Sequence, residues 1–268
     1  MPDQSLLNEV IALTDKVSAY QMSRFRTFPP GRGKEKTPRE LVSEVDLTSE
    51  AMLIEGLTKL LPEAGFHGEE TGKTGNKEHR WIIDPLDGTT NYLSGLEQFS
   101  ISVALYHKNE CQLGVVTRPA SRETFSACRG GGLQHNGIDA ARLPTELRLS
   151  SALLGIGFPY RSPDLADCFF PCAKEVLYKS LGLRRFGSAA LDLSYVAAGF
   201  LQGFWESDLQ PYDVAAALLF LQEAGCIVSN EQGENYQMDS DRILVCAPEQ
   251  IYHELLPIIA RHYAKQES

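Results

Sequence analysis

The 268-residue sequence predicts an α/β protein whose helices and sheets pack in layers. In the first half, short apolar runs separated by turn residues follow two helical stretches, and after about residue 148 strands alternate with helices. The length permits one large domain or two subdomains with a common core. We expect two subdomains, residues 1–145 and 146–268, in one compact unit, because no long linker separates them.

The first half begins with two amphipathic helices. Apolar residues recur at helical spacing over residues 4–26, and a second helix follows Asp46, a plausible N-cap, and ends before Pro62. Between them, residues 29–36 combine proline and glycine with like charges. This composition predicts a mobile, exposed loop that carries Lys36.

Short strands follow the second helix. Residues 81–83 form a buried apolar run, and residues 99–106, 113–117 and 123–128 form further runs separated by turn residues. We expect these later runs to form an antiparallel meander, which glycine-rich and Asn-Gly turns extend as far as residue 137.

The second half alternates strands with helices, as is typical of crossover units in layered α/β proteins. The expected strands are residues 152–157, 184–186, 201–206, 226–229 and 243–246. The expected helices are residues 165–180, a helix opening at Ser188, residues 213–224 and residues 248–265.

The composition argues against several classes of protein. With 43% hydrophobic and 22% charged residues, the chain is not disordered. Its formal charge of −10 repels nucleic acid and anionic membranes. The first 22 residues are amphipathic and acidic, and no apolar run reaches the roughly 18 residues of a membrane span, so we expect a cytoplasmic protein without membrane contact. The six cysteines form no metal-binding pattern and predict reduced thiols in the core.

The most informative motif lies between Trp81 and Tyr92, where a buried strand delivers Asp84 and Asp87 into a turn. Pro85 stiffens this turn, and Gly88 permits a close approach of other groups. Carboxylates crowded at a strand end suggest a functional site. The same residues could also form a simple turn whose side chains bond their own backbone.

Further motifs follow in a characteristic order. Glu69 stands in Gly68-Glu69-Glu70, and Asp213 follows Gln210-Pro211-Tyr212. The others are residues 36–46, residues 187–193 and residues 203–206. Together these motifs resemble the inositol monophosphatase family over nearly the whole chain. The resemblance implies that family's α-β-α-β-α layered fold and a lithium-sensitive, Mg²⁺-dependent phosphatase that forms a homodimer.

The candidate acidic residues suit a divalent metal. If Glu69, Asp84, Asp87 and Asp213 converge, they bring about −4 of charge into one pocket, and crowded carboxylates raise one another's pKa. All of these ligands are oxygen atoms, which favours Mg²⁺ or Mn²⁺ over zinc. Such ions would present positive potential to a phosphate, so the negative net charge does not exclude an anionic substrate.

The resemblance implies a role for each of these positions. Glu69, Asp84 and the carbonyl group of Leu86 would hold one metal, and Asp84, Asp87 and Asp213 would hold a second. The implied reaction is hydrolysis of a phosphate monoester by direct in-line attack of metal-held water, without a phospho-enzyme.

Other positions would assist the reaction. Thr89 would pair with Glu69 and orient the attacking water, and the N–H groups of Gly88 and Thr89 would face the phosphate. Lys36 would lie on a loop that closes on the metal site. Asp46 would support Lys36 or, through water, the groups around the metal. In each case a simpler role stays open: Thr89 and Asp46 as helix caps, and Lys36 as a solvated side chain.

The leaving group would be recognised by the second half of the chain. Glu206 matches the family position whose carboxylate accepts hydrogen bonds from inositol hydroxyls, and Gly187 and Ala189 match positions that approach the sugar through backbone atoms. The Gly-Ser-Ala-Ala segment could instead serve only a tightly packed turn. Asp208 adds an acid beside Glu206 and puts the identity of the alcohol in doubt.

The sequence therefore predicts an inositol-1-monophosphatase. Sister phosphatases that act on fructose 1,6-bisphosphate, histidinol phosphate or a 3′-phosphonucleotide are the first alternative. The second is a scaffold with an added role in binding nucleic-acid machinery, as in bacterial relatives. A phosphate or a partner protein could bind to Arg161, Arg184 and Arg185. The simpler expectation is that these three side chains are solvated.

Overall fold

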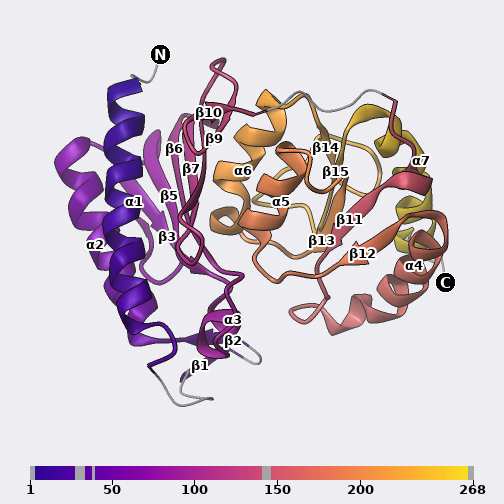
Figure 1. Ribbon diagram of the computed structural model, residues 1–268, viewed down its shortest axis with the longest axis horizontal. Coiled ribbons are helices and arrows are strands. Elements are labelled where there is room, and N and C mark those ends of the chain that lie inside the picture. Colours follow the sequence, from indigo (N-terminus) through magenta and orange to yellow (C-terminus); the bar gives the residue numbers. More distant parts are fainter. Residues whose placement is uncertain (1–3, 28–33, 38–39, 141–145, 265–268) are drawn as a thin grey trace.

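The computed structural model describes residues 4–27, 34–37, 40–140 and 146–264. Figure 1 shows five layers, which confirms the predicted α/β layered fold. Two helices cover an eight-stranded sheet, two further helices lie between this sheet and a five-stranded sheet, and two more cover the far side. The first sheet lies within residues 65–139 and the second within residues 153–247. The proposed division near residue 145 falls between them.

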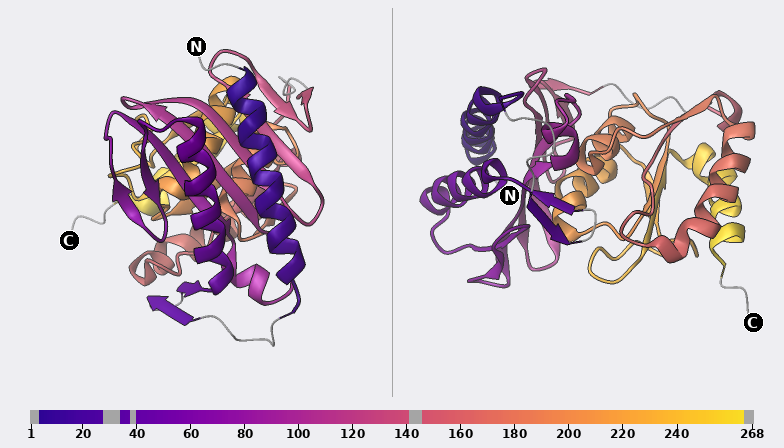
Figure 2. Two further views of the ribbon diagram at one scale, coloured as in Figure 1. Left: turned by 90° about the vertical axis from the view of Figure 1, so that its left-hand side faces the viewer. Right: turned by 90° about the horizontal axis from the view of Figure 1, so that it is seen from below.

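Helices α1 (Gln4–Arg24) and α2 (Glu44–Leu60) form the first layer. They lie side by side on the same face of the large sheet (Figure 2). Each buries an apolar stripe against β5–β7, as the spacing of its apolar residues predicts. The buried side chains of the two helices include Leu7, Val10, Val17, Leu53 and Leu57.

The start of α2 differs from the prediction. Ser43, and not Asp46, is the N-cap: its hydroxyl oxygen accepts the N–H of Val45 at 3.1 Å. Asp46 is the third helical residue, and its carboxylate accepts the N–H of Ser43 at 2.9 Å. The two residues thus form a capping box, which draws the Asp46 side chain back over the helix start.

A short hairpin precedes α2. Strand β1 (Lys34–Thr37) pairs antiparallel with β2 (Glu40–Val42), although residues 29–36 were expected to form a loop. Lys36 lies in β1, and its side chain is outside the part of the chain that the structure describes. Residues 29–33 of the expected loop are also outside the described residues.

The large sheet has the strand order β10-β9-β8-β7-β6-β5-β3-β4. Only the β3–β5 pair is parallel among these neighbours, so the predicted meander is confirmed over β6, β7 and β8. The strands are β3 (Gly65–Gly68), β4 (Gly72–Thr74), β5 (His79–Asp87), β6 (Ser100–His107), β7 (Glu110–Arg118), β8 (Glu123–Cys128), β9 (Leu133–His135) and β10 (Ile138–Asp139).

The smaller sheet has the order β12-β11-β13-β15-β14. Its first strands are parallel, as crossover connections require, and β15 runs antiparallel to both of its neighbours. The strands are β11 (Leu153–Ile156), β12 (Gly182–Arg184), β13 (Phe204–Ser207), β14 (Ile227–Ser229) and β15 (Ile243–Ala247). Strand β12 ends two residues before the predicted end of that strand, residue 186.

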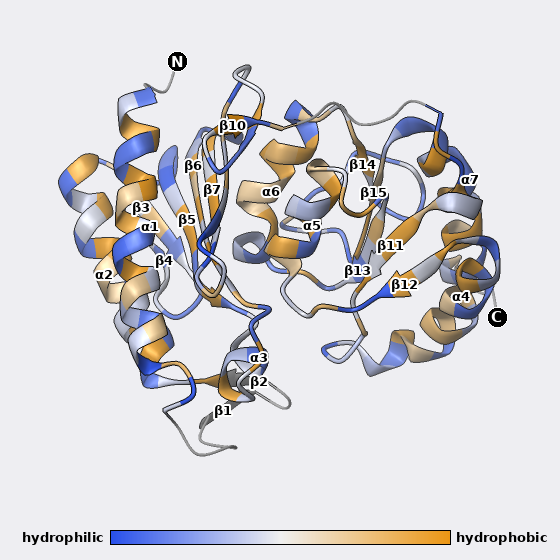
Figure 3. Ribbon diagram, viewed as in Figure 1, coloured by the Kyte–Doolittle hydropathy of each residue, from blue (hydrophilic) through white to orange (hydrophobic). Residues whose placement is uncertain are grey.

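Helices α5 (Ala189–Ala197) and α6 (Pro211–Glu223) form the central layer. They are apolar around much of their circumference, because both sides face a sheet (Figure 3). Helices α4 (Ala166–Lys179) and α7 (Glu249–Tyr263) cover the outer face, where α4 exposes Phe170, Leu177 and Tyr178 beside its polar residues. Helix α3 (Thr89–Leu93) and the 3₁₀ turns Leu149–Ser151 and Pro163–Leu165 complete the described elements.

The lengths of the helices and the state of the cysteines bear on two expectations from the composition. Among the described residues, none of the helices is both long and apolar enough to pass through a membrane. The cysteines are unpaired and buried or half-buried, as predicted for thiols of the core.

Candidate functional site

A cavity of about 280 Å³ opens where β5, α5 and α6 approach one another. Among the predicted site residues whose side chains the structure describes, all line it except Asp46. Its acidic lining comes from Glu69, Asp84, Asp87, Glu206 and Asp213, and its other lining residues include Leu86, Gly88, Thr89, Arg161, Arg185, Gly187 and Ala189.

The turn after β5 shapes one wall of the cavity. The pairing of β5 with β6 shifts register between Asp84 and Asp87, so both carboxylates face the same space. The N–H of Leu86 donates to Asp84 Oδ1 at 2.9 Å, which fixes that carboxylate. Gly88 has a φ of +94°, and a Cβ there would lie 2.9 Å from a backbone oxygen, so the turn requires glycine.

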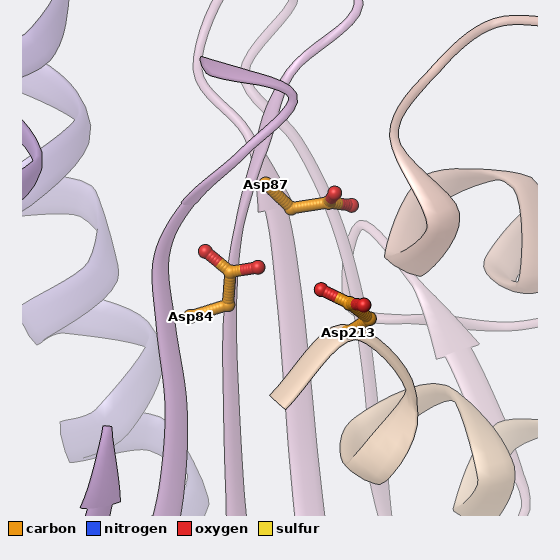
Figure 4. A group of neighbouring side chains, drawn as sticks. All are labelled: Asp84, Asp87 and Asp213. Carbon is orange, nitrogen blue, oxygen red and sulfur yellow. The ribbon is translucent and has the colours of Figure 1, made fainter. Parts of the chain in front are cut away.

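Three carboxylates meet in this cavity. Asp84, Asp87 and Asp213 each offer an oxygen, and these atoms all lie within 4.8 Å of one another. Figure 4 shows the side chains of the two β5 residues and of the α6 residue directed toward a common space. Their exposed fractions are only 1%, 8% and 5%, so water screens their charges poorly.

The raised pKa values of Asp84 and Asp87 show that ionising the clustered carboxyl groups costs free energy. Burial, followed by repulsion from Glu69, Asp87 and Asp213, raises the pKa of Asp84 well above its usual range. Burial and Asp213 also raise the pKa of Asp87, to about 6, although hydrogen bonds from Ser188 and Ala190 act in the opposite direction. An all-oxygen cluster that is costly to ionise fits a divalent cation, which would compensate the negative charge.

Glu69 lines the cavity at the end of the β3 segment. The turn that follows is held by Glu50 of α2, whose carboxylate accepts the N–H groups of Glu70 at 2.9 Å and Thr71 at 2.7 Å. Sequence reasoning missed Glu50. Its signal was an acidic residue three positions before Leu53 on the apolar stripe of α2.

The Thr89 hydroxyl has a different partner from the one expected. It donates to Asp46 Oδ1 at 2.8 Å and lies 3.1 Å from the carbonyl oxygen of Leu86, whereas a pair with Glu69 was predicted. Asp46 is buried directly behind Thr89, and this burial raises its pKa, partly offset by hydrogen bonds from Ser43 and Thr89. The capping box of α2 thus brings Asp46 to the threonine.

Ser188 connects the two sheets at the site. It occupies the N-cap position of α5, but its hydroxyl makes no cap hydrogen bond and donates to Asp87 Oδ2 at 2.6 Å. The N–H of Ala190 donates to the same oxygen at 2.8 Å. The start of α5 therefore orients one of the three clustered carboxylates.

Glu206, on β13, lines the same cavity. Burial and the charge of Asp213 raise its pKa to about 8, partly countered by Arg185 and Arg161. A Cβ on Gly157 would lie 1.8 Å from the Glu206 carboxyl carbon, so glycine is needed there to admit this side chain. Gly187 and Ala189 line the same region.

Asp208 does not act as an extra acid beside Glu206. Its carboxylate accepts hydrogen bonds from Arg242 at 3.0 and 2.8 Å, and it lines a separate cavity with residues that include His67. Its φ of +53° turns the chain after β13 and directs the side chain to that second cavity. The doubt that Asp208 raised about the substrate is therefore not supported.

Of the three arginines, only Arg161 differs from the expected solvated face, because Arg184 and Arg185 are both exposed. Arg161 lies in the cavity, and its Nη1 is 2.9 Å from Asp213 Oδ2. Arg185 reaches the cavity rim, where its guanidinium carbon lies 5.6 Å from the centre of the Phe158 ring. Arg184 is exposed, as expected.

Comparisons with known proteins agree with this geometry. The model of the inositol monophosphatase family matches residues 3–264. An inositol-1-monophosphatase of Rhizobium meliloti is 40% identical over 263 residues, which cover 97% of this chain and 98% of that protein. A putative Nus factor SuhB of Neisseria meningitidis serogroup B is 39% identical over 229 residues, or 85% of this chain and 87% of that protein.

A solved structure shows the same fold. The extragenic suppressor protein suhB of Bartonella henselae aligns with a TM-score of 0.88 at 32% identity, covering 95% of this chain and 98% of that one. The similarity thus extends over both sheets and all the segments that form the acidic cavity. On this evidence, the chain belongs to the inositol monophosphatase family.

Proposed function

We propose that this protein is a Mg²⁺-dependent phosphatase that hydrolyses myo-inositol 1-phosphate to myo-inositol and phosphate. One observation carries the proposal: the buried carboxylates of Asp84, Asp87 and Asp213 share a cavity with Glu206. The first three suit a divalent cation and a phosphate, and the fourth suits a polyhydroxylated leaving group. The relative named inositol-1-monophosphatase supports the same substrate.

The cation would be held by oxygen atoms alone. We propose Glu69, Asp84 and the carbonyl of Leu86 for one Mg²⁺, and Asp84, Asp87 and Asp213 for a second, with Mn²⁺ as a substitute. When bound, such ions supply Lewis-acid activation of water and charge neutralisation of the phosphate. Millimolar Li⁺ is expected to inhibit by competing for one of these positions.

The protein's own groups orient the water and the phosphate. Because the Thr89 hydroxyl donates its hydrogen to Asp46, a lone pair of Thr89 Oγ is left to accept a hydrogen bond from water in the cavity and so to orient it. The N–H groups of Gly88 and Thr89 are placed to donate to phosphate oxygens at the turn that opens α3. Lys36, on the β1–β2 hairpin, is proposed to close on the site.

The primary test is phosphate release from myo-inositol 1-phosphate by the purified protein. We expect turnover in millimolar Mg²⁺ and none after chelation. A side-by-side comparison of kcat/KM with fructose 1,6-bisphosphate, histidinol phosphate and a 3′-phosphonucleotide separates the proposal from the sister activities. A clear preference for any of these three would replace the proposed substrate.

Thr89→Ala should lower kcat about 100-fold, because it removes the group that orients the attacking water. Thr89→Ser keeps the hydroxyl and should stay within about fivefold of the wild type. Both values are measured with saturating myo-inositol 1-phosphate and Mg²⁺, after circular dichroism has verified folding. Equal activity of the alanine and serine variants would contradict the assigned role.

Glu206→Gln should raise KM for myo-inositol 1-phosphate, since an amide with one acceptor oxygen cannot replace the carboxylate toward ring hydroxyls. We expect kcat/KM to fall about 30-fold, which corresponds to about 2 kcal/mol. With 4-nitrophenyl phosphate, whose leaving group has no hydroxyl ring, the change should be less than about threefold. A similar loss for both substrates would exclude Glu206 as a leaving-group contact.

A second candidate function comes from the relatives named Nus factor SuhB. We propose an association with transcription machinery beside catalysis, in a protein that we also expect to be a cytoplasmic homodimer. Sedimentation velocity tests the dimer, and binding to purified RNA polymerase with and without Mg²⁺ tests the association. Absence of binding in both conditions would remove this candidate.

A further inference from the structure

Arg161 is a cation in a cavity that is otherwise suited to metal ions. It lies in the irregular segment between β11 and the 3₁₀ turn Pro163–Leu165, and it reaches Asp213 at the start of α6. Its Nη1 is 2.9 Å from Asp213 Oδ2, and the two side chains are only 21% and 7% exposed. A guanidinium group thus contacts one member of the clustered carboxylates directly.

The two carboxylate oxygens of Asp213 differ in their hydrogen bonds. Oδ2 accepts both the Arg161 guanidinium and the backbone N–H of Gln210, at 2.9 and 2.8 Å. Among the described residues, no hydrogen bond ends on Oδ1. One oxygen of Asp213 is therefore held by the protein, and the other is left for a ligand of the cavity.

The charges around Asp213 are more positive than those around Asp84. Asp213 receives a full charge from Arg161 and the partial positive charge of the α6 N-terminus, where it is the third helical residue. Asp84 and Asp213 both lie among other carboxylates, so the ion pair with Arg161 is what distinguishes Asp213. A divalent cation that uses Asp213 therefore meets a repulsive charge that a cation between Glu69 and Asp84 meets less strongly.

We infer that Arg161 is a built-in counter-charge that weakens divalent-cation binding at Asp213 and stabilises the acidic cluster when no cation is bound. The inference rests on the proposed function, because it assigns a role within the same metal site. Arg161 acts through Asp213, so it is a positioning residue and not a catalytic one.

The expected effect is large enough to measure. Arg161 and a divalent cation at Asp213 would repel each other in a cavity that water screens poorly, so loss of the Arg161 charge should change the affinity about tenfold, or by about 1.4 kcal/mol. Arg161→Gln removes the charge but keeps a side-chain amide that can donate to Asp213. We therefore expect the weaker Mn²⁺ site of Arg161→Gln to bind about tenfold more tightly than that of the wild type.

Mn²⁺ titration of the full chain by calorimetry and by electron paramagnetic resonance tests this inference. Arg161→Lys keeps the charge and should retain the wild-type affinity. Arg242→Gln is the matched control, because Arg242 pairs with Asp208 and Asp164 outside the cavity and should leave Mn²⁺ binding unchanged. In the metal-free state, Arg161→Gln should melt at a lower temperature than Arg161→Lys.

The outcomes separate this inference from the proposed function. If the wild type binds no Mn²⁺, the proposed function fails and the inference fails with it. If the wild type binds Mn²⁺ and Arg161→Gln binds it equally or more weakly, only the inference is overturned. Tighter Mn²⁺ binding by Arg161→Lys as well would also overturn it, because the effect would then not follow the charge.

Discussion

Asp84→Asn is expected to abolish phosphatase activity while it stabilises the metal-free protein. Asp84 is buried among Glu69, Asp87 and Asp213, and burial together with these neighbours raises its pKa. Asparagine has nearly the same shape, and its Oδ1 can still accept the N–H of Leu86. The substitution therefore removes a repulsive charge without opening a cavity, but it also removes the carboxylate proposed to bridge two metals.

The loss of activity and the gain of stability in Asp84→Asn are measured separately. We expect kcat with myo-inositol 1-phosphate to fall at least about 1,000-fold, or about 4 kcal/mol of transition-state stabilisation. In chelator at pH 8, the free energy of unfolding should rise by roughly 1 to 3 kcal/mol, because one costly charge is gone. Stabilisation by Mg²⁺ should largely disappear, since binding to the folded state alone produces it.

Asp164→Asn is the matched control. It makes the same chemical change at an exposed carboxylate that pairs with Arg242 outside the cavity. Both activity and stability should change little, because exposed ion pairs contribute about 0 to 1 kcal/mol. If Asp84→Asn kept near-wild-type turnover, or lost stability in chelator, the proposed role of the acidic cluster would be wrong.

Local patterns in the sequence predict the layered fold and the position of Asp84 and Asp87 at a strand end, whereas the meeting of these two residues with Asp213 was expected from the family resemblance. Each strand and helix of the second half has its own apolar pattern, and α6 begins where Asp213 follows a proline. Asp84 and Asp87 stand at the end of a buried strand, so their positions depend on local structure. Local patterns of this kind survive in the sequence without knowledge of distant contacts.

Two of the features that sequence reasoning missed depend on contacts between distant segments, and a third depends on a local backbone conformation. Thr89 pairs with Asp46, 43 positions earlier in the chain, and that pair forms only because Ser43 caps α2 and turns Asp46 inward. Arg161 stands in an irregular segment, where a charged residue is usually solvated, and only the fold brings it to Asp213. Asp208 stands two positions after Glu206 in the sequence. Its side chain nevertheless points to another cavity, because its backbone adopts a positive φ.

The metal-free protein is expected to lose stability as the pH rises from 5.5 to 8. Burial holds the pKa of Asp87 at about 6 and that of Glu206 at about 8, and it raises that of Asp84 as well. In the unfolded chain these carboxyls ionise near pH 4, so above that pH the folded state binds more protons than the unfolded state. Stability then falls with increasing pH until the folded-state groups have ionised, at about pH 6 for Asp87 and pH 8 for Glu206.

The loss should amount to roughly 3 to 6 kcal/mol, or a decrease of about 10 °C in melting temperature for a chain of this size. Saturating Mg²⁺ should restore most of it at pH 8 and little at pH 5.5, where protons and cations compete for the same carboxylates. Thermal melts in chelator and in Mg²⁺ across this range provide the measurement.

Glu206→Gln isolates one contribution to this pH dependence. Burial lowers the pKa of His67, which has the opposite effect on the pH dependence of stability. The folded state binds fewer protons at His67 than the unfolded state does, so this contribution to stability rises with pH. This contribution is common to the wild type and the variant, so the difference between their melting curves reports Glu206 together with the neighbouring carboxyls that it affects, such as Asp192. The variant should lose less stability between pH 7 and 8, since the largest ionisation in that interval belongs to Glu206. A metal-free wild type that kept or gained stability toward pH 8 would show that these carboxyls ionise at ordinary pH, and the cavity would then need no cation to balance it.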